Sequence, residues 1–388
     1  MKNQTFIPRL FIIAALTVSM VALPAPKLFP WGLFSIFTDA VPIDGETDTA
    51  GVFNPERDIL YLPMTEGRDI FETARDLSIL RNSEVRKHLY LYLTSKRAYT
   101  VRAISRSYRY EDAIIEIMRE NDDLPEELWL LPLLESCFNP HAVSSSRAIG
   151  LWQIMKNTSK PLGLRVDRWI DERRSIIKST EAALRHLRTM QKIFPRWDLA
   201  LAAYNGGAGY IRRAMDRTGI NGYWDLAARG LLRTETGEYV PKFLALMLIY
   251  QNQRLFGIAD EIVIPVKKES EIVELKRPAD LADVARISGV PLRTLRELNP
   301  DLRTTKTPPA IAQYHLVVPA EARDRIDEDS DDLYKNGLGG VIEYQVKKGD
   351  TISEIARRYN KKTSRILRLN GIKNAKSLQI GRIIYVPK

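Results

Sequence analysis

The sequence predicts an α+β protein of several domains, in which a long helical region precedes two small modules built from strands and helices. Across residues 66–258, apolar residues recur at helical spacing between proline and glycine breaks, and no convincing alternation of apolar and polar residues indicates a strand. After Gly257 the pattern becomes strand-like. Two segments of related sequence follow, and each closes on an apolar strand that ends in Val-Pro.

The N-terminal segment predicts export. Lys2 and Arg9 precede the apolar run Leu10–Leu23, which has the length of a signal peptide and is shorter than a typical membrane span. Residues 1–40 are therefore interpreted either as an export signal or as an uncleaved N-terminal anchor that associates with the membrane. Both interpretations place the protein in the cell envelope or periplasm. Residues 41–65 combine prolines and glycines with little periodicity, which predicts an extended lead-in.

Within the helical region, the apolar spacing predicts helix from Ile70 to about Tyr99 and again from Tyr110 to Arg119. From Pro125 to about Phe256 we expect a succession of helices, because proline and paired glycines interrupt the pattern at intervals. The predicted breaks are Asn139-Pro140, Pro161–Gly163, Pro195 and Gly206-Gly207.

Residues 262–320 and 341–388 are interpreted as two copies of one strand–helix–helix–strand unit. In the first copy, the opening strand is predicted at Ile262–Pro265. In the second, Asn370-Gly371 is predicted to end the second helix. The matching positions, at a constant offset, are Leu281, Val284, Ala285, Leu295, Leu298 and Asn299 with Ile352, Ile355, Ala356, Ile366, Leu369 and Asn370.

Residues 321–340, between the two copies, are predicted to form a flexible linker. Seven acidic side chains lie between Glu321 and Asp332, and Gly337, Gly339 and Gly340 follow. Like charges repel one another and glycine adds backbone freedom, so this composition favours an extended, mobile segment.

Charge is distributed unevenly along the chain. Residues 341–388 hold twelve Lys or Arg against three Asp or Glu, a net charge of +9 out of +10 for the whole sequence. A basic surface indicates an anionic partner. Export argues against nucleic acid, and an acidic polymer of the cell envelope is the partner we expect. The alternative is a solvated basic face that aids solubility.

Cysteine and histidine usage excludes several classes of site. The single cysteine, Cys137, permits no intramolecular disulfide, and four scattered histidines provide no metal-ligand spacing, so we expect no metal and no cofactor. Cys137 is interpreted as a small buried side chain rather than a nucleophile, because no histidine lies in a recognisable partner motif.

Glu135 is the candidate acid. It follows the apolar run Leu128–Leu134 and precedes Phe138, and Pro140 prevents the helix from continuing. A carboxylate among apolar side chains has its charged form disfavoured, so its pKa rises, which is the property that a general acid needs near neutral pH. The alternative is a glutamate that reaches solvent from the end of a helix.

Further motifs follow Glu135-Ser136 in order: Gly150-Leu-Trp-Gln153, the helix carrying Ser179–Ala183, Ala202–Gly207, and Thr234–Lys242. In this order they resemble the catalytic domain of the lytic murein transglycosylases of glycoside hydrolase family 23, with greatest similarity to the membrane-bound D type that carries C-terminal LysM modules. The resemblance implies an all-α, lysozyme-like fold with its catalytic core at residues 110–255.

The second copy resembles a LysM module, on the strength of Tyr344–Thr351 and Leu378–Gly381. The first copy has Pro278–Asp280 where the second has Gly349–Thr351, and a longer loop precedes its closing strand. We therefore interpret residues 262–320 as a degenerate LysM-like unit that serves packing more than binding.

The resemblance implies both a reaction and a set of residues. Glu135 would protonate the oxygen between N-acetylmuramic acid and N-acetylglucosamine, then accept the proton of the muramyl C6 hydroxyl as a 1,6-anhydro ring closes. Tyr239 would orient Glu135, although simple core packing is an equal alternative. The implied substrate-binding residues are Ser136, Ser144, Gln153, Tyr204 and Asn205, and those of the LysM module are Gly349, Asp350, Thr351, Asn370 and Leu378.

Two other functions are compatible with these motifs. A hydrolytic muramidase of the same fold would use water, but hydrolysis usually needs two carboxylates and the motifs provide only Glu135. A catalytically inactive murein-binding scaffold is the third reading, and Glu135 within its full set of motifs argues against it. The expected partners are peptidoglycan glycan strands, and no sequence feature indicates a protein partner.

Overall fold

The structure is a computed structural model of the chain. It describes residues 69–387, except 76, 121–122, 267–268, 276, 310–312, 329–332, 334–340 and 376–377. The predicted export segment, the lead-in and most of the glycine-containing end of the predicted linker lie outside the described residues. Among the helices of the described part, none is long and apolar enough to cross a membrane.

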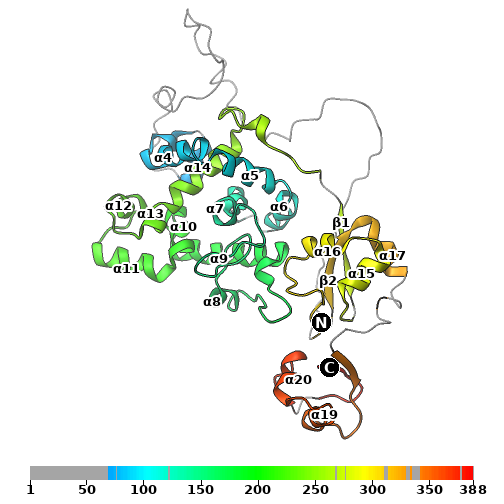
Figure 1. Cartoon of the computed structure of the whole chain (residues 1–388). Coiled ribbons are helices and arrows are strands. Elements are labelled where there is room, and N and C mark those ends of the chain that lie inside the picture. The colour runs from blue at the N-terminus through cyan, green and yellow to red at the C-terminus, as the bar shows by residue number, and fades with distance from the viewer. Residues whose placement is uncertain are drawn as a thin grey trace, which may run out of the picture. The chain divides into compact units, whose positions relative to one another are not determined.

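Helices make up the first part of the described chain, as predicted (Figure 1). Its elements up to residue 119 are α3 (Ile70–Arg75), the 3₁₀ turn η2 (Ser78–Arg81), α4 (Ser83–Leu93), α5 (Arg97–Ser107) and α6 (Glu111–Arg119). The remainder comprises η3 (Glu126–Leu130), α7 (Leu131–Ser136), α8 (Lys156–Ser159), η4 (Glu172–Arg174), α9 (Ile176–Ile193), α10 (Trp197–Gly206), α11 (Ala208–Thr218), α12 (Tyr223–Ala228), α13 (Thr234–Gly237), α14 (Tyr239–Gln251) and η5 (Ala259–Glu261).

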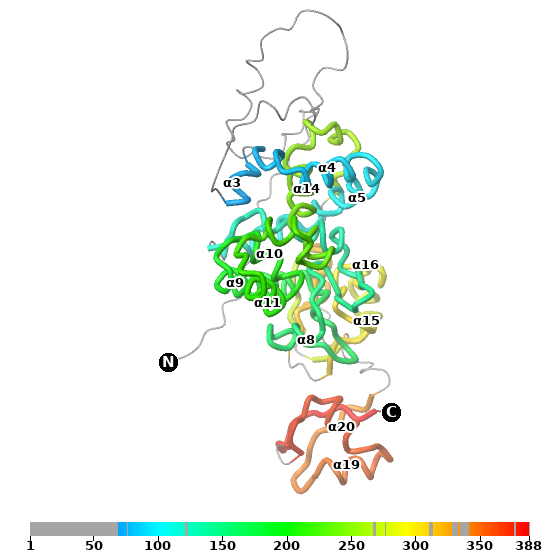
Figure 2. The backbone as a smooth tube through the Cα atoms, turned by 90° about the vertical axis from the view of Figure 1, so that its left-hand side faces the viewer, coloured from blue at the N-terminus to red at the C-terminus, as the bar shows by residue number. Residues whose placement is uncertain are grey.

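Helix α14 is the central element of this helical domain. Its residues from Tyr239 to Ile249 are apolar apart from Lys242, and most of them are fully buried. A helix that is apolar on all sides must be surrounded by others, and α14 contacts α4, α7 and α10. Both views show it beside α4 (Figures 1 and 2). In the described part of this domain, pairing of extended segments occurs only as isolated bridges such as Val143 with Ile149.

Two strand–helix–helix–strand units follow, which we term the first module and the second module. The first module contains β1 (Ser270–Leu275), α15 (Leu281–Ser288), α16 (Leu292–Leu298) and β2 (Tyr314–Pro319), with β1 and β2 antiparallel. The second contains β3 (Val341–Gln345), α19 (Ile352–Arg358), α20 (Thr363–Leu369) and β4 (Ile383–Pro387), and β3 and β4 are also antiparallel. The predicted plan of the repeat is confirmed.

The first strand of the first module is not where the sequence predicted it. Ile262–Pro265 forms no strand, and Val263 and Ile264 are 70% and 56% exposed. The opening strand is β1, whose residues pair with β2 from Ser270 with Pro319 to Leu275 with Tyr314. The short apolar run was misread because strand propensity depends on having a neighbouring strand with which to pair.

The predicted linker is also partly wrong. Arg323–Glu328 forms helix α17, which follows the 3₁₀ turn η6 (Ala320–Ala322). Ala322, Ile326 and Leu333 are buried in the core of the first module. The acidic composition concealed these apolar positions, of which Ala322 and Ile326 have helical i, i+4 spacing. This segment therefore completes the first module instead of separating the modules.

The helical domain and the first module are joined by backbone hydrogen bonds. The amide of Asp171 donates to the carbonyl of Asp301 over 2.8 Å, and the amide of Arg303 donates to the carbonyl of Trp169 over 2.9 Å. Between these bonds, Ile170 is buried within the apolar core of the first module. The loop before η4 thus anchors the first module to the helical domain.

Candidate active site

Glu135 lies near the end of the short helix α7. Leu131 and Leu133 are fully buried and fix this helix in the core, and Pro132 occupies its first turn, where no amide donor is needed. The helix ends in an unusual turn, because Cys137 and Phe138 both have φ of 54°. Positive φ is costly for such residues. The predicted helix end at Asn139-Pro140 is therefore reached through a strained turn directly after the carboxylate.

The acidity of Glu135 is set mainly by burial. Its pKa is raised from 4.5 to about 7, mainly because burial removes the carboxylate from water, with a smaller contribution from the nearby charge of Glu235. The hydroxyl of Tyr239 opposes this by donating a hydrogen bond to Oε1 of Glu135, which favours the carboxylate form and lowers the pKa. With a pKa of about 7, this side chain can both donate and accept a proton near neutral pH.

Tyr239 reaches Glu135 from the first residue of α14. Its ring is buried, and burial together with the adjacent Glu135 places the pKa of its hydroxyl well above the ordinary value. The hydroxyl therefore stays protonated and acts as a donor. The structure brings these two residues together, as the sequence predicted, although 104 positions separate them.

Tyr204 and Asn205, at the end of α10, each have a hydrogen bond within the protein. The hydroxyl of Tyr204 donates to the carbonyl of Trp152 over 2.8 Å. The Oδ1 atom of Asn205 accepts from the hydroxyl of Thr236 over 2.8 Å. Gly206 permits this approach, because a Cβ there would lie 2.9 Å from the hydroxyl oxygen of Thr236. The segments Ala202–Gly207 and Thr234–Lys242 are therefore packed against each other beside Glu135.

Three other predicted substrate-binding residues bond to the backbone of the protein. Ser136 is 8% exposed, and its hydroxyl donates to the carbonyl of Leu151 over 2.8 Å. The Oγ of Ser144 accepts from the amide of Ala148, and the Nε2 of Gln153 donates to the carbonyl of Gly150. These bonds shape the loop that follows Glu135, and contact of the three side chains with sugar stays a prediction.

Several residues important to the site were missed or only partly anticipated. Thr236 and Glu235 lie within a motif that the sequence had indicated, but nothing there assigned them their contacts with Asn205. Arg106 donates to the carbonyl of Cys137 over 2.8 Å and so holds the strained turn. No pattern could reveal this bond, because its acceptor is backbone. Trp152 is fully buried core, and its indole donates to Thr180 over 2.9 Å.

In the second module, the predicted binding loop is held by hydrogen bonds within the module. Gly349 has φ of 89°, which glycine adopts without strain. Asp350 accepts from the hydroxyl of Tyr344 and the amide of Lys347, both over 2.7 Å. Thr351 caps α19 through a reciprocal pair of bonds with Glu354. These bonds fix the loop, while its contact with glycan stays a prediction.

Asn370 requires a correction, because its side chain is unsuited to contact with glycan. It is 4% exposed, and its amide group bonds to backbone at three places, namely the carbonyls of Ile366 and Tyr385 and the amide of Tyr385. The side chain holds α20 against β4. The predicted helix end at Asn370 is confirmed. Leu378 is half-buried against the core of the module.

Comparison with known proteins identifies the parts of the chain. Residues 112–226 match the transglycosylase SLT domain, residues 269–335 match the LysM-like domain described as "Lytic transglycosylase MltD, LysM-like domain", and residues 344–387 match the LysM domain. The second of these matches ends beyond α17, in agreement with the corrected boundary.

Curated proteins agree with these matches. The chain is 32% identical over 332 residues to membrane-bound lytic murein transglycosylase D of Escherichia coli K12, covering 79% of this chain and 70% of that protein. It is 41% identical over 97 residues to a putative tributyltin chloride resistance protein of Alteromonas sp. strain M-1, covering 25% and 47%. It is 31% identical over 122 residues to membrane-bound lytic murein transglycosylase C of Edwardsiella ictaluri, covering 28% and 34%.

Proposed function

Because the chain belongs to the membrane-bound lytic murein transglycosylase D family, we propose that Glu135 is its single acid–base catalyst. Membership makes the protein a peptidoglycan lytic transglycosylase, a lyase-type enzyme of the cell envelope. The assignment of roles to individual residues is ours. It rests on one observation, the half-buried Glu135 with a pKa of about 7 held by Tyr239.

The proposed reaction needs one proton carrier and no water. The protonated carboxyl of Glu135 donates to the oxygen linking N-acetylmuramic acid to N-acetylglucosamine, and the bond from muramyl C1 to this oxygen breaks. The C6 hydroxyl oxygen of the same sugar then bonds to C1 while the carboxylate takes its proton. Glu135 ends protonated, and the products are a free N-acetylglucosamine end and a 1,6-anhydromuramic end. The nucleophile is already part of the bound sugar, so proximity favours the step.

Tyr239, Tyr204 and Asn205 are proposed to position the substrate and the acid. Tyr239 fixes the carboxyl through its hydrogen bond. The hydroxyl oxygen of Tyr204 donates to Trp152 and keeps acceptor capacity for a sugar hydroxyl or acetamide. The Oδ1 atom of Asn205 accepts from Thr236, while its amide group makes only a long 3.5 Å contact with Glu235. The acetamide oxygen of a sugar could replace Glu235 as the acceptor of that amide group.

Glu235 is the one observation that favours a second function, hydrolysis. It is an exposed carboxylate near enough to raise the pKa of Glu135. Most hydrolytic glycosidases use a pair of carboxylates in catalysis. In a muramidase it would activate water. In the transglycosylase reaction it has no chemical task.

Product masses separate the two reactions. Purified sacculi are digested with protein lacking residues 1–40, and muropeptides are analysed by mass spectrometry for the wild type and Glu235→Gln. We expect products one water lighter than reducing muropeptides, and we expect Glu235→Gln to form them as well. Reducing N-acetylmuramic ends that disappear in Glu235→Gln would establish hydrolysis and overturn the proposal.

We propose further that the second module carries the murein binding and that the first module does not. In the first module, the segment replacing the LysM loop bonds to another part of the module. The amide of Ala279 donates to the Thr307 hydroxyl over 2.9 Å, and the amide of Thr307 donates to the carbonyl of Ala279 over 3.0 Å. These bonds join the segment to the loop before β2 and support a packing role for it.

Sedimentation with purified sacculi across a salt series tests the two modules. Residues 341–388 should bind, residues 262–335 should not, and binding should persist above 0.1 M salt, where the Debye length is about 10 Å. Retention that vanishes entirely at moderate salt would show that charge alone binds. Equal retention of both fragments would refute the difference between the modules.

For the N-terminal segment, we propose that residues 1–40 direct export and either are cleaved or anchor the protein. Support comes from the apolar run flanked by Lys2 and Arg9 and from relatives named as membrane-bound. Fractionation of cells that express the chain with and without residues 1–40, followed by N-terminal sequencing, separates cleavage from anchoring. Envelope delivery without this segment would contradict the proposal.

A further inference from the structure

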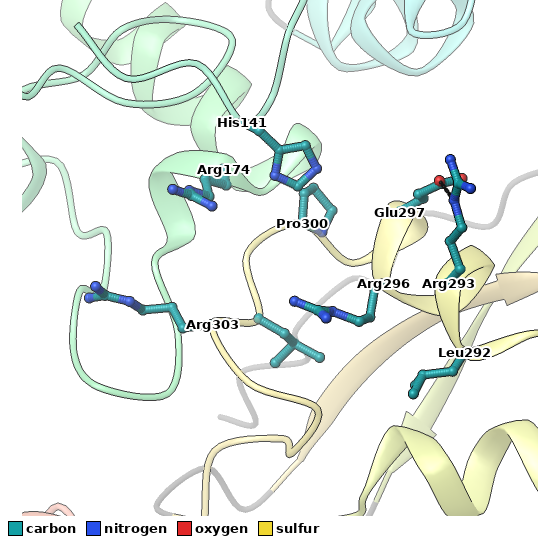
Figure 3. A pocket seen from close by; sticks show the side chains of 9 residues that line it. His141, Arg174, Leu292, Arg293, Arg296, Glu297, Pro300 and Arg303 are labelled. Carbon is teal, nitrogen blue, oxygen red and sulfur yellow. Dashed lines mark hydrogen bonds and ion pairs between the residues drawn. The ribbon is translucent and has the colours of Figure 1, made fainter.

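A pocket of about 540 Å³ lies where the helical domain meets the first module. His141 and Arg174 come from the helical domain, and the other lining residues come from α16 and the loop after it (Figure 3). The pocket lining contains four arginines and one acid, so it carries an excess of positive charge. The full lining is His141, Arg174, Leu292, Arg293, Arg296, Glu297, Pro300, Leu302 and Arg303.

The arginines of this pocket differ in how their charge is used. Arg293 pairs with Glu297 over 2.9 Å, and Arg303 donates to the carbonyl of Asp167. Arg174 and Arg296 have no acidic partner among the described residues. The Nε of Arg174 is moreover buried without a hydrogen-bond partner in that part of the chain. Because these two guanidinium groups pair with no acid of the described residues, their terminal amino groups are the donors that an anion in the pocket would use.

The pKa of His141 is affected by the same excess of positive charge. Burial lowers the pKa of this imidazole, and the charges of Arg174 and Arg296 lower it further. His141 is thus predominantly neutral near pH 7 and adds hydrogen-bonding capacity without adding charge. An anion is the ligand that Arg174 and Arg296 favour, since no described acid pairs with either of them, and arginine binds a carboxylate through two parallel bonds.

We infer that this pocket binds a free carboxylate of the murein stem peptide while the glycan strand occupies the site at Glu135. The inference rests on the proposed function of Glu135. Three features support this ligand: Arg174 and Arg296, which pair with no acid of the described residues, the apolar side chains of Leu292 and Leu302 for the methyl groups of alanine, and the short chain to the catalytic residue. Fully extended, the chain from Glu135 to His141 spans at most about 20 Å.

Direct binding is the first test. A synthetic stem tetrapeptide with free carboxylates, the same peptide with its carboxylates amidated, and inorganic phosphate are titrated into the full chain by calorimetry. The variant is Arg174→Gln with Arg296→Gln, and the matched control is Arg102→Gln with Arg229→Gln, which removes two exposed arginines outside the pocket.

We expect the free-carboxylate peptide to bind to the wild type and to the control, roughly tenfold more weakly to the pocket variant, and the amidated peptide not to bind measurably. Phosphate that binds as tightly as the peptide and displaces it would make this a general anion site and overturn the assignment. Equal binding by the pocket variant would overturn the location. Arg296→Gln alone, at an exposed position, should weaken binding while leaving the fold unchanged.

Cleavage of two substrates separates this inference from the proposed function. The pocket variant should digest intact sacculi several-fold more slowly than the wild type, and glycan strands stripped of peptide by an amidase at the wild-type rate. Equal slowing on both substrates would show that the arginines serve only the fold or general charge. Failure of the wild-type protein to release anhydro products from either substrate would instead refute the role of Glu135.

Discussion

Glu135 in the helical domain and Asn370 in the second module are both polar side chains held in apolar surroundings, yet they are satisfied in opposite ways. Among the described residues, Glu135 receives a single hydrogen bond, from Tyr239, and burial raises its pKa to about 7. Asn370 makes three hydrogen bonds, all to backbone. In the first module, Asn299 repeats that arrangement with Leu295 and Val317.

The difference separates a group held for chemistry from groups held for structure. Each asparagine bonds once to its own helix and twice to the closing strand, so the side chain acts as part of the backbone network. Glu135 keeps acceptor capacity that the protein does not use, in surroundings that disfavour its charge. Removing one or the other should therefore affect different observables.

The largest effect is expected for Glu135→Gln. Glutamine keeps the shape but cannot transfer a proton, so activity on sacculi should fall by roughly 10²–10⁴-fold. Product release measured by chromatography, with circular dichroism as the control for folding, tests this. More than a tenth of wild-type activity in folded protein would place the acid elsewhere.

The same substitution should increase stability at high pH. The pKa of Glu135 is raised in the folded protein, so its stabilising contribution is complete below pH 4.5 and is lost as the pH rises through about 7. Glu135→Gln has no such loss and should gain roughly 2–3 kcal/mol over the wild type at pH 8 but little at pH 4. Urea unfolding at both values measures the difference, and equal gaps would contradict the raised pKa.

Asn370→Ala should destabilise the second module by about 1–3 kcal/mol, because it removes three buried hydrogen bonds to the backbone of Tyr385 and Ile366. Hydrogen exchange of the amides in β4 should quicken, and retention on murein should weaken. Asn299→Ala is the matched control, which should loosen the first module while murein retention stays unchanged. Loss of retention in both variants would contradict the separate roles of the modules.

The smallest effect is expected for Tyr239→Phe. The hydrogen bond from Tyr239 lowers the pKa of Glu135, so removing it should shift the alkaline limb of the pH–rate profile to higher pH. Activity at the optimum should fall by about tenfold or less, since the acid remains but is less well oriented. An unshifted profile with the same loss would assign Tyr239 to packing alone.

The local pattern of the sequence determined the larger features of this protein. Apolar spacing predicted the helices from Ile70 onward, and the offset between the repeats predicted both modules. The apolar run before Glu135 predicted the raised pKa. These inferences succeeded because helical periodicity and burial beside apolar neighbours are encoded within a few turns of chain.

Apart from the pair of Glu135 and Tyr239, which the resemblance implied, tertiary structure alone decided which distant groups meet. Only the folded chain shows Arg106 holding the carbonyl of Cys137, Asn370 facing backbone instead of glycan, and α17 packing on the first module. The pocket containing Arg174 and Arg296 likewise joins positions from two parts of the chain. Such contacts depend on how distant segments pack, which a local sequence pattern does not specify. Many of them also involve backbone atoms, and these cannot be distinguished in the sequence because nearly every residue carries the same backbone donor and acceptor.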